Sequence, residues 1–405
     1  MAAFKVARDF ASWPVGAKKR RPPTAPTSAF RGHGCRGLTA AEAAQARILA
    51  CRRIGRDSLR GVILARSPFA SYCWRMKPFA TETVKATGLT ELQRSLELDR
   101  IYRKGCLPVS ACRRDSGQFR VLSWNIERGH APARIAETIT RLRPDVACLQ
   151  EVDWGNERTG RRDVLEFLAE RTGMLGLFGI EFLELNSSRR SPKFAGGGAT
   201  GNALLTKLEP VSSFRVELPP SLDWSRAAED RNVPGSVRWR VRRQPRLGAR
   251  FGIGAELAMG GRNLFVCSLH LEDKLGGVRG RWAQYVASVR AVEARRGAAM
   301  GVIAGDFNTF DCRLARFVTP DGKATAHGKP ASVTEADWWQ GTLLPSIGYA
   351  DPFTSAEWTF CVPPLFRSKL DWITIKGAEV QSRGIGPFSS SDHRPIWADL
   401  DTESC

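Results

Sequence analysis

Long apolar runs are absent from this chain of 405 residues. Its longest apolar runs have the length of a strand, and none approaches the roughly 20 residues that cross a bilayer. No secretory signal is expected, because no apolar segment of about 7–15 residues with a small-residue cleavage site follows the basic N-terminus. The sequence therefore predicts an intracellular, cytoplasmic protein with no transmembrane segment. An organelle transit peptide is the alternative, since residues 1–36 are rich in arginine and poor in acidic residues.

Paired cysteine motifs are missing as well. The ten cysteines are scattered along the chain, with no Cys-x-x-Cys pair. Cys148 and Cys267 lie inside strand-like apolar runs, where a thiol behaves as a small hydrophobe. This spacing in a long chain favours reduced thiols over a disulfide framework.

Internal repeats and a phosphate-binding glycine loop are also absent. The Gly-rich stretch 196–201 lacks the spacing and the trailing Lys-Ser/Thr of a P-loop. We expect a mobile surface loop at this position.

Positive charge is concentrated in the N-terminal part of the chain. Residues 1–115 hold 23 Lys and Arg against 8 Asp and Glu, a balance of +15 out of a total of +20. The remaining 290 residues carry 38 against 33 and are nearly neutral. A basic extension on a nearly neutral body is typical of a segment attracted to polyanions such as nucleic acid. A solvated, partly disordered leader is the alternative.

Three parts are predicted along the chain. Residues 1–37 contain a Lys/Arg run followed by Pro, Thr, Ala and Ser, which predicts a basic flexible arm. Residues 38–115 are predicted to form a short helical or irregular basic extension, in which Thr39 precedes Glu42 at capping-box spacing. Nothing in this extension carries recognisable chemistry. Residues 116–405 are predicted to form one globular domain.

Strands and helices alternate in the predicted domain. Residues 119–126 are rich in strand formers, Ile135, Ile139 and Leu142 recur at helical spacing, and residues 146–149 indicate a buried strand. Further helices are expected at 163–171 and 279–296, further strands at 178–185, 202–207, 369–376 and 395–400, and a hairpin at 250–258 and 263–271. Residues 212–247 are predicted to be a long surface excursion, and 310–365 are poorly patterned. Together these elements predict a mixed-sheet α/β domain.

A short acidic cassette follows one of these apolar runs. Asp306 and Asn308 come directly after the run 300–304, and residues two apart on a strand point to the same side. The two side chains can therefore converge on one ligand. Taken alone, this pattern is more typical of a turn or a helix cap.

Polar residues recur at the ends of the other predicted strands. They are Asn125, Glu127, Glu151, His270, Asp371, Asp392 and His393. Each has a structural alternative, such as a helix-start acid for Glu151, an edge charge for Asp371 or a satisfied core histidine for His270. Their recurrence at successive strand ends favours a common site.

These stretches resemble the endonuclease/exonuclease/phosphatase superfamily, the metal-dependent phosphoesterases similar to deoxyribonuclease I, abasic-site endonucleases and sphingomyelinases. The matching stretches are Leu122-Ser123-Trp124-Asn125-Ile126, Leu149-Gln150-Glu151-Val152, Gly201-Asn202-Ala203-Leu204-Leu205, Ser268-Leu269-His270-Leu271, Ala304-Gly305-Asp306-Phe307-Asn308-Thr309, Leu370-Asp371-Trp372 and Ser391-Asp392-His393. The resemblance implies a four-layered α/β/β/α sandwich with two mixed sheets and an active site at one edge. Residues 1–115 fall outside it.

Metal ligands follow from the resemblance together with the chemistry of the side chains. Phosphoesters resist nucleophiles because their oxygens are anionic, and a hard divalent ion held by oxygen ligands offsets that charge. Glu151 is the first expected ligand, with Asn125 beside it and Asp392 closing the site. Glu127 is expected to assist a second ion. The expected ion is Mg²⁺, with Mn²⁺ as a substitute.

Catalytic roles are assigned in the same way. Asp306 is expected to orient or deprotonate the attacking water, and Asn308 to donate to a phosphoryl oxygen. His393 is expected to bind phosphoryl oxygens or act as acid or base, with Asp371 accepting its other ring proton. His270 is expected to be a second phosphate contact.

Two assignments stay open from the sequence. The partner of His270 is either Glu181 or Glu184. Asn202 begins a strand of the family pattern, where it either contacts the substrate phosphate or has a structural role.

The sequence thus predicts a Mg²⁺-dependent phosphoesterase acting on nucleic acid or on a phospholipid or small phosphoester. The alternative is a catalytically inactive binding module of the same fold that holds nucleic acid with the basic arm. Arginine-rich stretches at 158–162 and 238–246 offer contacts to a polyanion, with solvated loops as the alternative. The sequence makes no prediction about oligomeric state.

Overall fold

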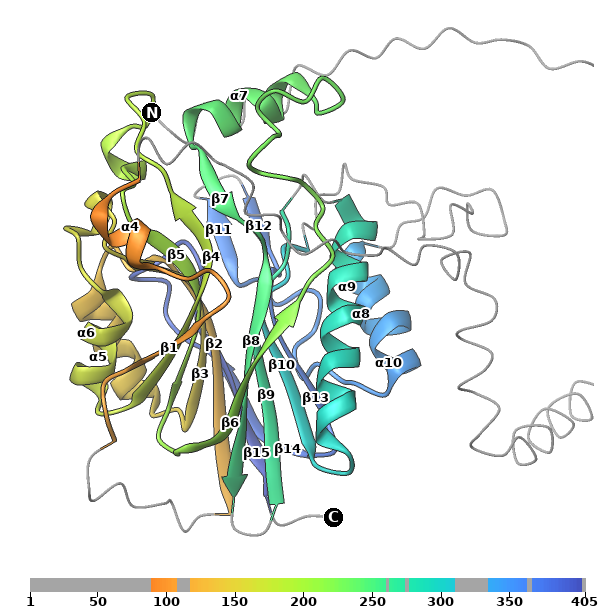
Figure 1. Cartoon of the computed structure of the whole chain (residues 1–405). Helices are drawn as coiled ribbons and strands as arrows, with labels where there is room; N and C mark the ends of the chain where they lie inside the picture. Colours follow the sequence, from red (N-terminus) through yellow and green to blue (C-terminus); the bar gives the residue numbers. More distant parts are fainter. Residues whose placement is uncertain are drawn as a thin grey trace, which may run out of the picture. The chain divides into compact units, whose positions relative to one another are not determined.

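The computed structural model describes residues 89–107, 117–259, 262–273, 277–309, 334–362 and 366–402. The chain divides into two units, Met1–Lys85 and Ala86–Cys405, and all described residues belong to the second. The predicted arm and the predicted helix start at Thr39 lie outside the described residues. Figure 1 shows the second unit as two stacked sheets with helices on their outer faces.

The larger sheet carries the first predicted site residues. Its strand order is β1-β4-β5-β3-β2-β15-β14, and β7 pairs with β4. These strands are β1 (Ile101–Lys104), β2 (Gln118–Arg128), β3 (Val146–Trp154), β4 (Leu175–Glu184), β5 (Ala199–Thr206), β7 (Arg246–Gly248), β14 (Val380–Ile385) and β15 (Ile396–Asp401). The sequence predicted five of these strands, at 119–126, 146–149, 178–185, 202–207 and 395–400, and all five are present.

The smaller sheet has the order β13-β10-β9-β8-β6. Its strands are β6 (Pro210–Glu217), β8 (Phe251–Met259), β9 (Arg262–His270), β10 (Met300–Asp306) and β13 (Asp371–Lys376). The predicted hairpin is confirmed, with Met259 opposite Arg262 in the β8–β9 register. β2 pairs with β3, and β9 with β10, in parallel, whereas the other neighbours described in these two sheets run antiparallel. Both sheets are therefore mixed, as predicted.

Alternation along the strands separates the layers of the sandwich. In β3, Val146 and Cys148 pack into the core between the two sheets, while Ala147 and Leu149 pack against the helices outside. Successive side chains of a strand point to opposite faces, so the apolar run at the start of β3 needs a partner on each side. The thiol of Cys148 is buried as a small apolar group, and the four cysteines among the described residues are free thiols.

Helices complete the four-layered sandwich on both outer faces (Figure 1). Helices α5 (Pro132–Leu142) and α6 (Val164–Thr172) cover the larger sheet. The smaller sheet is covered by α8 (Gly277–Arg296), α9 (Glu335–Trp338), a π-helical turn (Trp339–Leu343) and α10 (Leu344–Ile347). The remaining elements are α4 (Glu91–Ser95), α7 (Gly235–Arg243), 3₁₀ turns at Glu157–Thr159 and Pro192–Phe194, and a hairpin of β11 (Phe360–Val362) and β12 (Phe366–Ser368). The predicted fold class is confirmed.

Two helices show how local sequence fixes the outer layers. In α5, Ile135 and Ile139 lie one turn apart and are buried, and Arg143 ends the helix in a left-handed conformation. In α6, the Asp163 side chain accepts the backbone N–H of Glu166 at the N-terminus. This capping satisfies a donor that the first turn leaves unpaired.

Residues before position 116 take part in the larger sheet. β1 pairs antiparallel with β4. The buried side chain of Gln93 in α4 donates to the carbonyls of Glu184 and Gly198 at 3.0 Å and 2.8 Å. The sequence placed these residues in a separate basic extension, and the sheet therefore reaches N-terminal to the predicted domain start.

The Gly-rich stretch 196–201 is buried, so the prediction of a mobile surface loop is wrong. A Cβ at Gly198 would lie 2.2 Å from the carbonyl oxygen of Trp154, and one at Gly201 would lie 1.8 Å from that of Gly179. Glycine is needed here because neighbouring backbone approaches too closely for a side chain.

The surface excursion predicted at 212–247 is also partly wrong. It contains most of β6, the helix α7 and the start of β7. Val237 and Val241 of α7 are buried against Trp224 and Phe182. Strand β6 is an edge strand with few buried residues and α7 is rich in arginine, so neither shows a strong apolar period.

Two further details differ from the predictions. The sequence pattern places Trp282, Val286, Val289 and Val292 along one face of α8, whereas the buried face centres on Tyr285, Val289 and Val292, with Val286 only half-buried. Strand β14 was not predicted, because it is an exposed edge strand with little apolar pattern. No helix within the described ranges combines the length and the apolar character that a membrane crossing requires.

Glu293 of α8 supplies a test of stability against pH. Its carboxylate accepts from Arg296, Lys376 and Tyr349. Burial raises the pKa of Glu293, but these donors outweigh burial and lower it to about 2. A depressed carboxyl pKa stabilises the fold above the unfolded value of about 4.3 and loses that contribution as the pH falls towards 2. Glu293→Gln is expected to lower the unfolding free energy by about 1 kcal/mol at pH 7, because the group is partly exposed.

This difference between Glu293→Gln and the native chain should shrink as the pH falls from about 4.5 to about 2. Urea unfolding at several pH values measures it, with Glu379→Gln on an exposed position as the matched control. Equal stability of Glu293→Gln and the native chain at pH 7 would contradict the prediction.

Candidate active site

The predicted site residues follow strands whose ends meet at one edge of the sandwich. In the smaller sheet, Asp306 at the end of β10 lies opposite His270 of β9 and opposite Asp371 of β13. In the larger sheet, Asn125 of β2 lies opposite Gln150 of β3. The strand register therefore brings together side chains that are far apart in the sequence.

A hydrogen bond between Asn125 and Asp306 joins the two sheets at this edge. Asn125 Nδ2 donates to Asp306 Oδ2 at 3.0 Å, and both residues are buried. Asn125 Oδ1 accepts the backbone N–H of Glu127, also at 3.0 Å. Asn125 thus fixes the distance between the β2 and β10 strand ends.

Asp306 is the central carboxylate of the group. Its Oδ1 accepts the backbone N–H of Asn308 at 2.9 Å. The Nε2 atoms of His270 and His393 lie 3.5 Å and 3.7 Å from its Oδ2. The carboxylate is held by two N–H donors and flanked by two imidazoles, an arrangement suited to orienting a water molecule and taking its proton.

His393 and Asp371 form a buried pair. His393 Nδ1 lies 2.8 Å from Asp371 Oδ2, within hydrogen-bond distance. Burial lowers the pKa of His393, but the carboxylates of Asp371, Asp306 and Asp392 outweigh burial and hold it well above its usual range. These carboxylates favour the protonated imidazole, and its Nε2 lies on the side of Asp306.

Glu151 lies on the larger-sheet side of the site. Its side chain is 26% exposed and its Oε2 lies 3.3 Å from Arg128 Nε. Burial raises the pKa of Glu151, but the neighbouring side chains, Arg128 and His270 foremost, lower it to about 2. Glu151 is thus ionised and reachable from solvent, as a metal ligand must be.

Asp392 completes a group of carboxylates. Burial, together with the like charges of Glu127, Glu151 and Asp306, raises the pKa of Asp392 to about 6, although His393 lowers it. Neighbouring like charges favour a proton or a cation between them. Carboxylates and the Asn125 amide oxygen are hard donors, so the residues present fit Mg²⁺ or Mn²⁺.

A second grouping could also hold a cation. Donor atoms of Asp306, Asp371 and His393 lie within 4.8 Å of one another, and Asp371 Oδ1 has no hydrogen-bond partner. The close contact between His393 and Asp371 already occupies this grouping. Glu151, Asp392 and Glu127 do not belong to this grouping, which is the one set of three such donors found among the described residues.

The partner of His270 is Glu181 rather than Glu184. Glu181 Oε2 lies 3.6 Å from His270 Nδ1. Glu184 instead pairs with Arg190 at 2.6 Å and lies 3.8 Å from Arg158. Glu181 and Glu184 occupy different faces of β4, and this difference decides which of them contacts His270.

Asn202 and Asn308 both have structural contacts. Asn202 is fully buried and donates to the carbonyl of Phe251 at 2.8 Å and to Glu181 at 3.3 Å. Asn308 Nδ2 donates to the carbonyl of Leu271 at 2.9 Å, which leaves one N–H of that amide for another acceptor. Asn202 therefore supports Glu181, while Asn308 keeps a donor at the site.

Sequence reasoning missed two arginines and a serine at this site. Arg128 lies against Glu151, and Arg250 Nη1 lies 3.0 Å from Glu181 Oε2. Ser391 Oγ donates to the carbonyl of Asn125 at 2.7 Å. No local pattern distinguishes these arginines from surface ones. Ser391 precedes Asp392 in a matched stretch, and that position was the available signal.

Left-handed backbone recurs at the strand ends. Glu127, Arg128, Glu151 and Asn308 have φ between 45° and 66°, a region that residues with a Cβ avoid by about 1 kcal/mol or more. The β2–β3 register also shifts between Asn125 and Arg128. Glu127, Arg128 and Asn308 lie at or just beyond the ends of β2 and β10, whereas Glu151 lies at a register shift inside β3.

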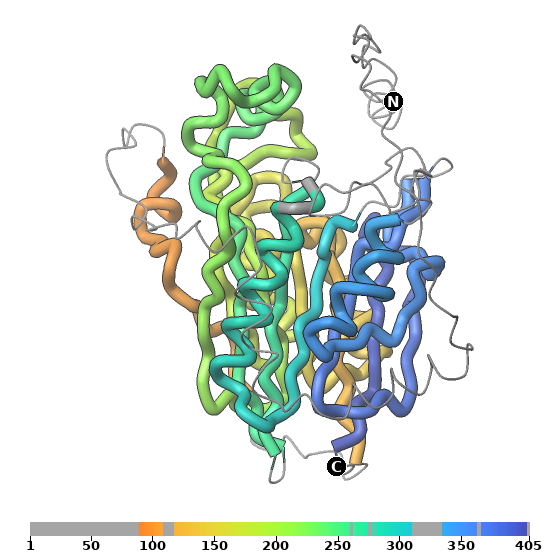
Figure 2. The backbone as a smooth tube through the Cα atoms, turned by 90° about the vertical axis from the view of Figure 1, so that its right-hand side faces the viewer, coloured from red at the N-terminus to blue at the C-terminus, as the bar shows by residue number. Residues whose placement is uncertain are grey.

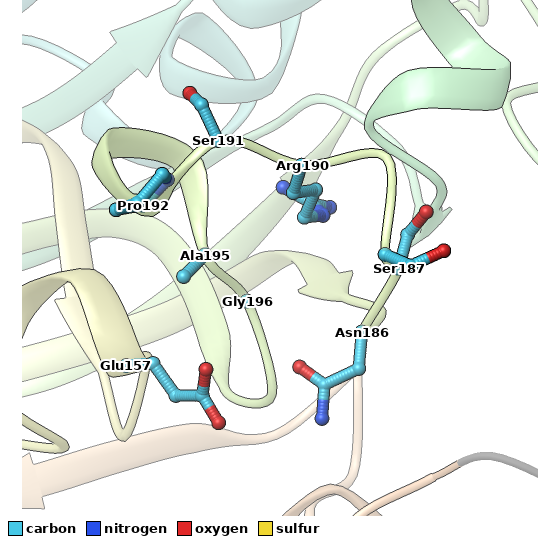
Figure 3. A pocket seen from close by; sticks show the side chains of 9 residues that line it. Glu157, Asn186, Ser187, Arg190, Ser191, Pro192, Ala195 and Gly196 are labelled. Carbon is cyan, nitrogen blue, oxygen red and sulfur yellow. The ribbon is translucent and has the colours of Figure 1, made fainter.

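An open hollow of about 650 Å³ lies on the loop between β4 and β5 (Figure 3). It is lined by Glu157, Asn186, Ser187, Ser188, Arg190, Ser191, Pro192, Ala195 and Gly196. None of the predicted site residues lines it. Its arginine, Arg190, is already paired with Glu184.

The two-sheet sandwich and the strand-end site define a protein of the deoxyribonuclease I-like fold. The family model for the endonuclease/exonuclease/phosphatase family matches residues 122–393. The chain belongs to this family, and the resemblance noted in the sequence is confirmed. No curated protein sequence matches the chain.

Several solved structures are similar to the chain. An endonuclease/exonuclease/phosphatase from Beutenbergia cavernae is 20% identical, with 70% of this chain and 71% of that chain covered and a TM-score of 0.49. The catalytic domain of human Nocturnin is 17% identical, with 74% and 97% covered and a TM-score of 0.45. ANGEL2, a 2′,3′-cyclic phosphatase, is 16% identical, with 71% and 96% covered and a TM-score of 0.46.

Proposed function

We propose that this chain hydrolyses phosphoester bonds with the help of a divalent metal ion, Mg²⁺ or Mn²⁺. The observation that carries the proposal is the Asp306 carboxylate, held by Asn125 across the two sheets and flanked by His270 and His393. A fixed carboxylate between two imidazoles is suited to proton transfer at a phosphoryl centre.

Metal binding is assigned to Glu151, Asp392 and Asn125, with Glu127 available for a second ion. When bound, the ion offsets the charge of the phosphoryl oxygens and lowers the pKa of water. Arg128 contacts Glu151 in the described structure and would reorient or share that carboxylate.

Proton transfer is assigned to Asp306 and His393. Asp306 orients the attacking water and takes its proton, which leaves the oxygen to form a bond to phosphorus. The bond from phosphorus to the leaving oxygen breaks as His393, whose pKa Asp371 raises, donates its Nε2 proton to that oxygen. Asn308 and His270 donate to the remaining phosphoryl oxygens as negative charge develops.

The inactive binding module remains the competing hypothesis. An inactive relative would be expected to lose a residue such as Glu151, Asp306, Asp392 or His393, and all four are present. Their convergence at one edge supports catalysis. A role for the basic arm in holding nucleic acid is tested by deleting residues 1–85 and measuring the salt dependence of binding.

The direct test is hydrolysis by the purified chain, with Mg²⁺, with Mn²⁺ and with EDTA. The substrates are plasmid DNA, RNA, sphingomyelin, phosphoinositides and bis(4-nitrophenyl) phosphate. Metal-dependent turnover of any of them supports the proposal. Absence of turnover on all of them, in a folded preparation, would overturn it.

Glu151→Gln gives a sharper test of the metal site. The variant is expected to raise the Mg²⁺ concentration for half-maximal activity by about 10- to 100-fold, because a neutral amide binds a hard cation more weakly. Metal titration of the initial rate measures this. Glu127→Gln, at a position paired with Lys193, is the matched control and should shift the titration less. A larger shift for Glu127→Gln would exchange the roles of the two glutamates.

A further inference from the structure

A small hairpin forms a wall beside His393. Backbone hydrogen bonds join Cys361 of β11 to Asp392 at 3.2 Å and Arg394 to Thr359 at 2.6 Å. The Phe360 ring lies 4.9 Å from the His393 ring. Figure 2 shows the β11–β12 hairpin, in blue, rising next to the end of β10. Side chains on this hairpin are therefore within reach of a substrate that extends beyond the scissile phosphate.

Beside this hairpin, two guanidinium groups lie close to the same aromatic ring, and we include these residues and Phe388 in the wall. Arg367 and Arg394 lie 4.7 Å and 4.6 Å from the centre of the Trp358 ring. No carboxylate within the described residues forms an ion pair with either arginine, and Arg394 Nε donates only to the carbonyl of Gly386. Two neighbouring cations without an acid partner attract an anion.

The Phe182 ring offers a comparison within the same molecule. It also carries two guanidinium groups, those of Arg246 at 4.7 Å and Arg250 at 5.4 Å. Here the chain supplies acids, since Arg250 pairs with Glu181 at 3.0 Å and Glu184 attracts Arg246. The pair at Trp358 lacks this neutralisation, which points to a ligand as the source of negative charge.

An exposed aromatic residue adjoins the two arginines. Phe388 is 39% exposed and packs edge-on against Trp358, with ring centres 6.0 Å apart. Aromatic faces beside arginines stack unpaired bases, while guanidinium groups hold phosphates with two parallel N–H donors. The wall thus offers both contacts that one nucleotide needs.

We propose that Trp358, Phe388, Arg367 and Arg394 form a second substrate site, which binds the nucleotide next to the scissile phosphate of a single-stranded nucleic acid. The phosphate lies against the two guanidinium groups and the base lies on the exposed aromatic surface. This inference rests on the proposed phosphoesterase function and narrows its substrate class. A single exposed phenylalanine provides little apolar area for insertion into lipid, so nucleic acid fits better than a membrane surface.

The kinetic test compares a single-stranded oligonucleotide with bis(4-nitrophenyl) phosphate, which has no neighbouring phosphate. Arg367→Gln alters an exposed side chain, and Arg367→Gln/Arg394→Gln removes both charges. For the oligonucleotide, the double variant is expected to raise KM about 10-fold, with kcat within about twofold of the native chain. The small ester should be hydrolysed as before. Unchanged KM for the oligonucleotide, or an equal loss on both substrates, would overturn the proposal.

A matched control is provided by Arg295→Gln. Arg295 also lies over an aromatic ring, 4.6 Å from the centre of Phe214, but it belongs to the last turn of α8, the end from which the chain runs into the start of β10. The slope of log(kcat/KM) against log salt should fall by about 0.7 for each arginine lost at the wall. Arg295→Gln should leave this slope unchanged. An equal change of slope in the control would overturn the assignment to the wall.

A binding assay in EDTA separates this proposal from the proposed function. Fluorescence anisotropy with a labelled single-stranded oligonucleotide requires no turnover, and the double variant should bind about 10-fold more weakly. If the native chain binds the oligonucleotide in this assay but hydrolyses none of the substrates when Mg²⁺ or Mn²⁺ is supplied, the phosphoesterase proposal fails and the nucleotide site stands. A last assay measures binding to phosphatidylserine vesicles by sedimentation. Loss of vesicle binding with unchanged oligonucleotide binding would assign the wall to lipid and overturn the proposal.

Discussion

Replacing Asp306 by asparagine is expected to lower kcat by about 1,000-fold, a loss of about 4 kcal/mol of transition-state stabilisation. The substitution keeps the shape of the side chain but removes the group that takes the proton from water. In the native chain Asn125 Nδ2 donates to Asp306 Oδ2. The substitution also introduces a side-chain N–H₂ group, and this second donor would face Asn125 Nδ2. Asp306→Ala is therefore measured alongside, because it removes the base without this clash.

Initial rates at saturating metal, with circular dichroism to confirm folding, measure the effect of both Asp306 variants. Asp230→Asn is the control, since Asp230 is exposed and accepts only a local backbone N–H in its turn. Metal-dependent turnover that is unchanged in both variants would remove Asp306 from the mechanism.

The second large effect concerns the pair of His393 and Asp371. His393→Gln is expected to lower kcat/KM by about 1,000-fold and Asp371→Asn by about 100-fold. In the proposed mechanism Asp371 acts through His393, since its Oδ2 lies 2.8 Å from His393 Nδ1 and its charge raises the pKa of that imidazole. The double variant should therefore lose no more than His393→Gln alone, since residues that act as a unit are not additive. Losses that multiply in the double variant would show that Asp371 acts independently.

A pH profile adds a readout that a merely structural role would not move. Asp371 raises the pKa of His393, so its removal lowers that pKa. The fraction of cationic His393 then falls at a lower pH, and the basic limb of the kcat/KM profile of Asp371→Asn should move to lower pH. A basic limb at the same pH as in the native chain would contradict this role.

Much of the fold could be predicted from local patterns because its central strands are apolar on both faces. Strands β3 and β10 begin with continuous apolar runs that are followed by polar residues, and β2 is rich in strand formers. Edge strands such as β14 are exposed and carry no such run. Glycines were misread at 196–201 because a sequence does not show whether glycine serves a turn or a close backbone approach.

The sequence could predict which residues belong to the candidate site but not which residues they contact. Asp306 and Asp392 stand in recognisable motifs, whereas the choice of Glu181 over Glu184 depends on which face of β4 each residue occupies. Arg128 and Arg250 contact the site only because the strands bring them there. A basic side chain in a sequence is by default a surface residue, so long-range packing alone reveals these two.

The left-handed residues at the strand ends have a consequence for transplanting this chemistry. Glu127, Glu151 and Asn308 take their directions from backbone that their own side chains disfavour. The surrounding sheets must therefore impose those conformations. Copying the motifs into another two-sheet scaffold would transfer the functional groups without their directions. A successful graft would need the strand register and the bulge after Asn125 as well as the residues.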